Sequence, residues 1–229
     1  TPPLPPSPPP SPPGAIVSTL ADSTGRTVDA TGTSANFFNP TGVALSPSGS
    51  FALVADYHYS MILHIDVGSG VVTKLAGKGV FAWAGTSDGV GSNAHFSKPS
   101  SICLADHGRV AFVVDWTTGR LRRIDVATAT VSTIAGSTSA TPVDGVGTDA
   151  KFWYPRGVTA TADGSTVFVA DFSGAKVRRV DVASRTVTTL AGSGTAGSAD
   201  GIGTSAGIKY PWGIAVTPDG ATVYFTEET

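Results

Sequence analysis

The chain contains 229 residues with a formal net charge of −2, and 41% of its residues are hydrophobic while only 14% are charged. This length suits one larger domain with a tail. The nearly balanced charge argues against a protein that binds nucleic acid or an anionic membrane surface, and no apolar run approaches the roughly 18 residues of a membrane-spanning helix. The single cysteine, Cys103, lies in the apolar run SICLA and is expected to be a small buried side chain.

Residues 1–14 form a proline-rich segment that begins TPPLPPSPPPSPP. Proline fixes φ and has no N–H, so we expect a polyproline II rod. The Ser-Pro-Pro-Pro run resembles the hydroxyproline-rich glycoproteins of plant and green-algal walls, the extensins and their relatives. That resemblance implies hydroxylated prolines with short glycans, and sugars on serine. A plain stiff linker and a ligand for an SH3 or WW domain are the alternatives. The candidate glycosylation positions are Pro5, Pro6, Pro8, Pro9, Pro10, Pro12, Pro13, Ser7 and Ser11.

Residues 15–229 are built from repeats, which several marks in register reveal. An anchor proline recurs at intervals of 59, 56 and 56 residues, and an acidic residue follows each proline by 16 residues while another precedes it by 11. The complete units cover residues 38–96, 97–152 and 153–208, and a partial unit combines residues 209–229 with residues 15–37. The anchors are Pro40, Pro99, Pro155 and Pro211.

Each complete unit predicts four β-strands and no helix. The first two strands are apolar, and the second has no polar face, which is typical of a strand buried on both sides. The third strand mixes apolar and charged residues, as in LRRIDV, and the fourth is rich in Thr and Val. Four-stranded units that repeat around an axis describe the blades of a β-propeller.

The repeats also resemble those of the NHL-repeat propellers. The matching segments are VFVAD, VRRVD, TLAG and DGIG, and the most complete match runs from residue 155 to residue 206. The resemblance implies an all-β fold in which four-stranded antiparallel blades form a propeller. About four blades are visible in the sequence, the last of them incomplete, and the polyproline II rod precedes them.

Two sets of repeated acids invite a functional interpretation. The aspartates of the Asp-Gly loops suggest calcium, but each loop offers one main acid, so we expect turns in which the carboxylate accepts backbone N–H bonds and glycine supplies a positive φ. The aspartates that end the second strands recur in every blade, and we expect them to brace the turn into the third strand. The loop acids are Asp88, Asp144 and Asp200, and the strand acids are Asp56, Asp115 and Asp171.

The remaining candidates for a functional site are arginines, histidines and aromatic residues. We expect the arginine pairs to join a surface network with aspartates rather than bind RNA. The four histidines show no metal-binding spacing. His58 follows the second strand of the first unit, a position from which a side chain can reach the mouth of a propeller. We expect the aromatic residues Phe38, Tyr154 and Trp212 to pack between blades, and Trp83 stays open as a candidate binding residue. The arginines are Arg122, Arg123, Arg178 and Arg179.

The two ends of the chain predict an incomplete last blade. Residues 213–216 and 222–226 supply its first and second strands, and the segment AIVSTLA at residues 15–21 supplies a strand of the fourth type. The third strand is missing, which leaves backbone groups unpaired. We therefore expect either that the native chain continues past residue 229 or that another copy inserts the missing strand.

These observations predict a non-catalytic, extracellular structural or adhesive glycoprotein, a component of a cell wall, matrix or surface fibre. Its expected partners are O-linked glycans and other copies of the chain, with no nucleic acid and no membrane span. We expect no catalytic residue, no cofactor and no metal. The alternatives are a propeller enzyme, such as a metal-dependent lyase or hydrolase, and a plain protein-interaction scaffold.

Overall fold

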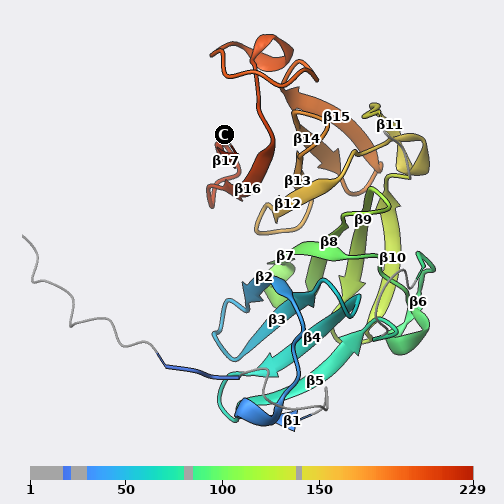
Figure 1. Ribbon diagram of the computed structural model, residues 1–229, viewed down its shortest axis with the longest axis vertical. Helices are drawn as coiled ribbons and strands as arrows, with labels where there is room; N and C mark the ends of the chain where they lie inside the picture. Colours follow the sequence, from blue (N-terminus) through green and yellow to red (C-terminus); the bar gives the residue numbers. More distant parts are fainter. Residues whose placement is uncertain (1–17, 22–29, 80–84, 138–140, 229) are drawn as a thin grey trace, which may run out of the picture.

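The computed structural model describes residues 18–21, 30–79, 85–137 and 141–228. The proline-rich segment, all its candidate glycosylation positions, Asp29 and Trp83 lie outside these residues. The described part forms three five-stranded antiparallel sheets and one two-stranded sheet, arranged side by side along an arc (Figure 1). The predicted β-propeller fold of four-stranded antiparallel blades is confirmed, with a short fifth strand added to each of the first three blades.

The strands of each blade follow one order from the outer edge to the inner edge. Blade 1 has the order β1-β5-β4-β3-β2, and blades 2 and 3 repeat it. Blade 1 consists of β1 (Ala30–Thr31), β2 (Pro40–Leu45), β3 (Phe51–Asp56), β4 (Met61–Asp66) and β5 (Val71–Ala76). Blade 2 consists of β6 (Gly89–Val90), β7 (Pro99–Ala105), β8 (Val110–Asp115), β9 (Arg120–Asp125) and β10 (Thr130–Ala135).

Blade 3 consists of β11 (Gly145–Val146), β12 (Pro155–Ala160), β13 (Thr166–Asp171), β14 (Lys176–Asp181) and β15 (Thr186–Ala191). Blade 4 contains β16 (Pro211–Val216) and β17 (Val223–Glu227). Short 3₁₀ turns complete the described elements: η1 (Gly32–Ser34), η2 (Gly91–Asn93), η3 (Asp106–Gly108), η4 (Gly147–Asp149) and η5 (Gly203–Ser205). No helix in the described ranges has the length and apolar character needed to cross a membrane.

The short outer strands β1, β6 and β11 are a feature that the sequence analysis missed. Each comes from the loop before its blade and pairs with the last strand of that blade, as β6 does with β10. The loop is an Asp-Gly loop for β6 and β11, whereas β1 begins at Ala30. A two-residue strand is too short to show an alternating pattern, so periodicity cannot reveal it. The blade is therefore closed at its outer edge by residues that precede its innermost strand.

The blades pack through their second strands and through the close approach of their first strands. All residues of β8 and β13 are buried, as the lack of a polar face predicted. A Cβ at Gly157 would lie 2.3 Å from the carbonyl oxygen of Trp212 in blade 4, so only glycine allows this contact. The half-buried Cys103 packs against the core between blades 2 and 3, and burial raises the pKa of its thiol to about 12.

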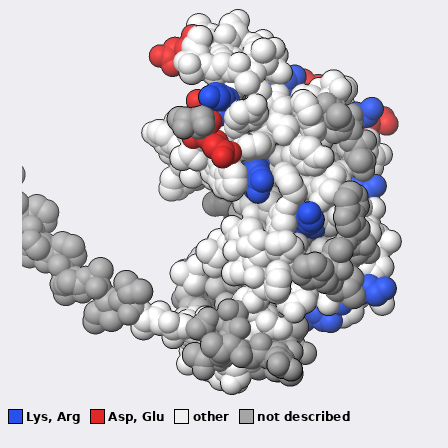
Figure 2. Space-filling view, viewed as in Figure 1, with Lys and Arg blue, Asp and Glu red and all other residues white. Residues whose placement is uncertain are grey.

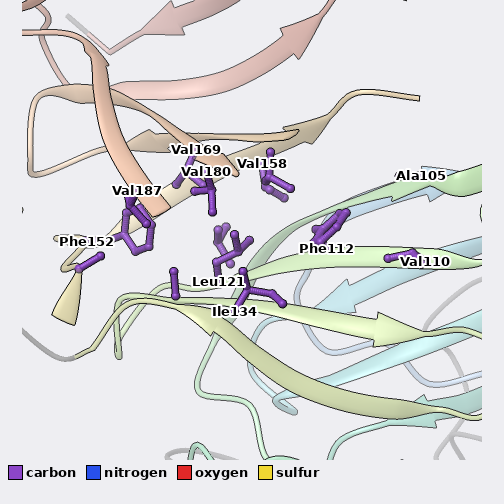
Figure 3. Packing of buried hydrophobic residues seen from close by; sticks show 14 residues of the cluster. Ala105, Val110, Phe112, Leu121, Ile134, Phe152, Val158, Val169, Val180 and Val187 are labelled. Carbon is purple, nitrogen blue, oxygen red and sulfur yellow. The ribbon is translucent and has the colours of Figure 1, made fainter. Parts of the chain in front are cut away.

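Side chains of blades 2 and 3 meet in the largest described core cluster (Figure 3). The core residues labelled there include Phe112, Leu121 and Ile134 of blade 2 and Val158, Val169 and Val180 of blade 3. A second cluster joins blades 1 and 2 in the same way. Because neighbouring blades share these cores, the residues at their loops are held in fixed relative positions.

The predicted pairing of the two ends of the chain is not seen in the described residues. Residues 18–21 form no strand, and Ala21 packs against the core of blade 1. Blade 4 lies at the other end of the arc (Figure 1). The part of the segment AIVSTLA that the structure describes therefore adds no fourth strand to β16 and β17.

Candidate binding surface at the loop end of the blades

Two kinds of loop lie side by side at one end of every blade. The anchor proline at the start of the first strand pairs in register with the acid at the end of the second strand, as Pro99 does with Asp115. The loop before the first strand therefore meets the turn after the second strand. Trp116 N donates to Lys98 O at 3.1 Å, and blades 1 and 4 repeat this bond. In blade 3 the two loops are joined one residue further on, by Ser173 N and Trp153 O at 3.0 Å. We call this end of the blades the loop face.

Buried aspartates fix the loops of blades 2 and 3. Asp115 accepts hydrogen bonds from Arg122 Nη1 at 2.9 Å and from the backbone N of Ser97 at 3.1 Å, and both charged side chains are fully buried. Asp171 is held in the same way by Arg178 at 2.9 Å. Burial raises the pKa of Asp115, and it raises the pKa of Asp171 to about 6 although Arg178 opposes the shift.

Blade 1 holds its aspartate without an arginine. Leu63, fully buried, occupies the position of Arg122 and Arg178. Asp56 accepts instead from the backbone N–H groups of Phe38 at 2.8 Å and Tyr59 at 3.1 Å. In this blade the carboxylate does brace the turn that leads into the third strand, and it also fixes the loop before the first strand.

The acids of the Asp-Gly loops do more than the predicted local turn. Asp88 lies 2.9 Å from Arg122 Nη2 and accepts from the N of Thr133 at 3.0 Å, which is 45 residues away in the fourth strand. Asp144 contacts Arg178 and Thr189 in the same way. Asp200 holds the equivalent place in the last loop and forms no ion pair with a residue that the structure describes.

Two predictions about these loops are wrong in detail. The glycine directly after the aspartate does not supply the positive φ: a Cβ on Gly89 would lie 3.0 Å from the backbone of Asn93, and the positive φ belongs to Gly91. The expected surface network of arginines is a buried one for Arg122 and Arg178. The long arginine side chain lets a buried guanidinium contact two carboxylates at once. The local sequence does not show that these two carboxylates lie close to the arginine.

A group of aromatic and basic side chains covers the loop face above these buried acids. We call it the aromatic–cation surface. Its rings form contacts from blade to blade: Tyr57 to Trp116 at 5.6 Å between centroids, Trp116 to Tyr154 at 5.0 Å, and Phe172 to Tyr210 at 5.1 Å. Its members are Tyr57, Lys98, Trp116, Tyr154, Arg156, Phe172, Tyr210 and Trp212.

Two cations lie among these rings. The guanidinium carbon of Arg156 is 4.6 Å from the ring centroid of Trp116 and 4.3 Å from that of Trp212. Lys98 Nζ is 5.4 Å from the ring centroids of both Tyr57 and Trp116. Burial lowers the pKa of Arg156, but a guanidinium still stays charged at neutral pH. Neither cation forms an ion pair within the described ranges.

The backbone at this surface is unusual in three blades. Lys98, Tyr154 and Tyr210 have φ values of 59°, 51° and 49°, although each is a non-glycine residue directly before a proline. Such residues normally adopt extended conformations, so this backbone is maintained by its surroundings. The strained backbone places these three side chains on the loop face.

The aromatic residues predicted to pack between blades do so only in part. Tyr154 contacts Trp116 of blade 2 and Trp212 contacts Phe172 of blade 3, but the exposed fractions of Tyr154 and Trp212 are 39% and 45%. Phe38 contacts His58 and Tyr59 of its own blade and is 54% exposed. His58 lies at the edge of the surface, whereas His64 stacks on Phe51 of β3. The sequence signal that was missed is an aromatic residue directly after each strand acid.

No family model matches the chain. Among curated proteins, it is 29% identical over 153 residues to Protein SUPPRESSOR OF QUENCHING 1, chloroplastic, of Arabidopsis thaliana, which covers 64% of this chain and 14% of that protein. It is 28% identical over 161 residues to NHL repeat-containing protein 2 of Bos taurus, covering 67% of this chain and 22% of that protein. The chain thus spans about a fifth or less of the length of these relatives.

Solved structures share the fold. An auxiliary nutrient binding protein of Bacteroides ovatus matches with a TM-score of 0.63 at 22% identity, covering 83% of this chain and 46% of that one. Virginiamycin B lyase of Staphylococcus aureus matches with a TM-score of 0.52 at 14% identity, covering 82% of this chain and 49% of that one. At such identities the likeness shows the fold alone. The chain is thus a β-propeller in fold and is similar in sequence to NHL repeat-containing protein 2.

Proposed function

We propose that the chain is a non-catalytic binding scaffold and that its aromatic–cation surface holds a protein partner. The observation that carries the proposal is the convergence of eight aromatic and basic side chains from four blades on one loop face, of which all but the buried Tyr57 are partly exposed. Aromatic residues and arginine are the side chains enriched at the energetic centres of protein interfaces. The rigid cores between blades would present this surface to a partner with little loss of entropy.

The alternative, a propeller enzyme, needs reactive groups that are free to act. Three of the acids at the loop face are instead buried and engaged: Asp115 and Asp171 each contact a buried arginine, and Asp56 accepts backbone N–H bonds. The exposed Glu227 of blade 4 accepts the backbone N–H of Lys209. No group of three or more His, Cys, Asp and Glu side chains suited to a metal occurs in the parts that the structure describes. These observations favour the scaffold.

The setting of this scaffold is a further part of the proposal. The Ser-Pro-Pro-Pro segment favours an extracellular glycoprotein of a wall, matrix or fibre, in which O-linked glycans coat a stiff rod and other copies are partners. Mass spectrometry of the N-terminal peptide from native material tests this setting. Hydroxyproline and pentose additions would support it, and a peptide of unmodified mass would contradict it.

Selection from a phage-displayed peptide library tests the scaffold directly. The immobilised chain is expected to enrich peptides that lose binding to the double variant Tyr210→Ser/Trp212→Ser. The matched control is Ile202→Ser, which removes a 93% exposed apolar side chain in an outer loop. Circular dichroism and thermal melts establish that each variant is folded. Enriched peptides that bind the double variant as well as the parent would contradict the proposal.

A further inference from the structure

We infer that the aromatic–cation surface recognises a peptide segment that carries carboxylates, and that Arg156 and Lys98 bind those carboxylates. The inference rests on the proposed scaffold function and names the chemistry of its partner. It follows from the charges, the ring contacts and the backbone at this surface, which are considered in turn.

The first step is the imbalance of charge at the surface. Every ion pair found in the described residues joins an arginine to an aspartate of its own blade or loop, as Arg122 is joined to Asp88 and Asp115. Arg156 and Lys98 have aromatic neighbours in place of such a carboxylate. The surface thus presents two cations and one nearby acid, Glu228, whose charge acts on Arg156 but which forms no ion pair with it among the described residues. An anionic group would complement the two cations.

The second step is the geometry of the cations. Both lie within 5.4 Å of the ring centroid of Trp116, so they can act on the same segment of a ligand. Two indole rings flank the guanidinium of Arg156, which restricts its rotation before any ligand arrives. A planar guanidinium held in this way can donate two parallel hydrogen bonds to one carboxylate. Preorganisation of this kind lowers the entropy lost on binding.

The third step distinguishes a peptide from a polyanion. Lys and Arg side chains are scattered rather than clustered over the view of the molecule in Figure 2. Nucleic acid needs many phosphate contacts for its affinity, and a surface with two cations offers few. Around these cations lie the partly exposed rings of Tyr154, Tyr210 and Trp212. A ligand with one or two carboxylates beside apolar side chains matches this composition, and an acidic peptide segment has both.

Calorimetric titration with two matched peptides tests the inference. One is a four-residue peptide, acetylated and amidated at its ends, that alternates glutamate and tyrosine, and the other has glutamine in place of glutamate. The acidic peptide is expected to bind at least tenfold more tightly, which corresponds to one charged hydrogen bond. Arg156→Gln and Lys98→Gln are expected to weaken its binding about tenfold or more, and Arg156→Lys is expected to weaken it less because it keeps the charge.

The control variant is Arg179→Gln, which removes an exposed cation on β14 with the same change in net charge. It is expected to change the dissociation constant less than twofold. Equal binding of the two peptides, or full binding by Arg156→Gln in a folded protein, would overturn the inference. Tighter binding of an acidic oligosaccharide than of the acidic peptide would overturn the choice of a peptide. If the library instead enriches uncharged peptides that depend on Tyr210 and Trp212, the scaffold proposal stands and this inference fails.

Discussion

Blade 1 and blade 2 hold the same repeated aspartate with different partners. In blade 2, Asp115 lies beside the fully buried Arg122, whose guanidinium also reaches Asp88 at the outer edge. In blade 1, Leu63 fills the position of the arginine, and Asp56 is satisfied by backbone N–H groups alone. Both aspartates are fully buried. The comparison teaches that the fold requires an acceptor at this point but does not require an ion pair.

The largest effect is expected from Arg122→Leu, which gives blade 2 the residue that blade 1 has. The change leaves Asp115 as a buried charge without its counterion, so we expect the free energy of unfolding to fall by about 3–5 kcal/mol. Urea unfolding monitored by circular dichroism measures it. Arg123→Leu, at the next and less buried position, is the control and should change stability by about 0.5 kcal/mol or less. Equal stabilities of the two variants would show that Asp115 needs no cation.

A smaller loss is expected from Asp56→Asn in blade 1. The amide keeps one oxygen for the N–H of Phe38 but turns an NH₂ group toward a second donor, Tyr59 N. We expect a loss of about 1–3 kcal/mol in the same unfolding experiment. A loss as large as that of Arg122→Leu would mean that the charge itself, and not the acceptor, holds blade 1 together.

The pH dependence of Arg178→Leu sharpens the comparison. The pKa of Asp171 in the folded chain, about 6, lies above the value of an unfolded aspartate, so the folded state binds the proton more tightly. Stability contributed by this protonation therefore rises as the pH falls through the folded pKa. Loss of Arg178 raises that pKa further, so the deficit of the variant should shrink between pH 8 and pH 5, by up to about 1.4 kcal/mol per pH unit. A deficit that is constant with pH would contradict the shifted pKa.

The smallest effect is expected at the outer edge of the blade. The side chain of Asp88 is half exposed. When Asp88 is removed, Arg122 still forms its ion pair with Asp115. We expect Asp88→Ala to cost about 1 kcal/mol, because solvent weakens the pair and the bonds to Thr133 are exposed. Asp200→Ala is the matched control, since its carboxylate contacts no described arginine, and it should be neutral. If Asp88→Ala leaves the free energy of unfolding unchanged, the contacts of Asp88 at the outer edge do not stabilise the blade.

The repeat in the sequence predicted most of the fold because the marks of a blade are local. Proline, turn residues and the fully apolar second strand each act within a few neighbouring residues. The outer strand β6 and the contacts of Asp88 were not predicted, because they join residues about 40 to 45 apart, where pattern analysis has no signal. Arg122 illustrates the limit: its charge suggested a surface position, and only the positions of two carboxylates explain its burial.

The aromatic–cation surface was the least predictable part. Trp116 and Phe172 follow the strand acids, and Tyr154 precedes an anchor proline, so the positions are visible in the sequence. What the sequence does not show is that the two loops lie against each other and that rings of adjacent blades meet. That proximity depends on the pairing of Pro155 with Asp171 and on the angle between blades. Aromatic residues that the sequence analysis assigned to packing are therefore also exposed.

The closure of each blade by the loop that precedes it bears on how such a chain can grow. In blade 2, the outer strand β6, Asp88 and their partners Arg122 and Thr133 all lie within one continuous stretch of sequence. Blade 3 repeats the arrangement with Asp144, Arg178 and Thr189. A gene segment of one repeat length thus encodes a blade together with the outer strand and the aspartate contacts that close it. Tandem duplication of that segment would lengthen the arc by a whole blade without breaking a contact inside any existing one.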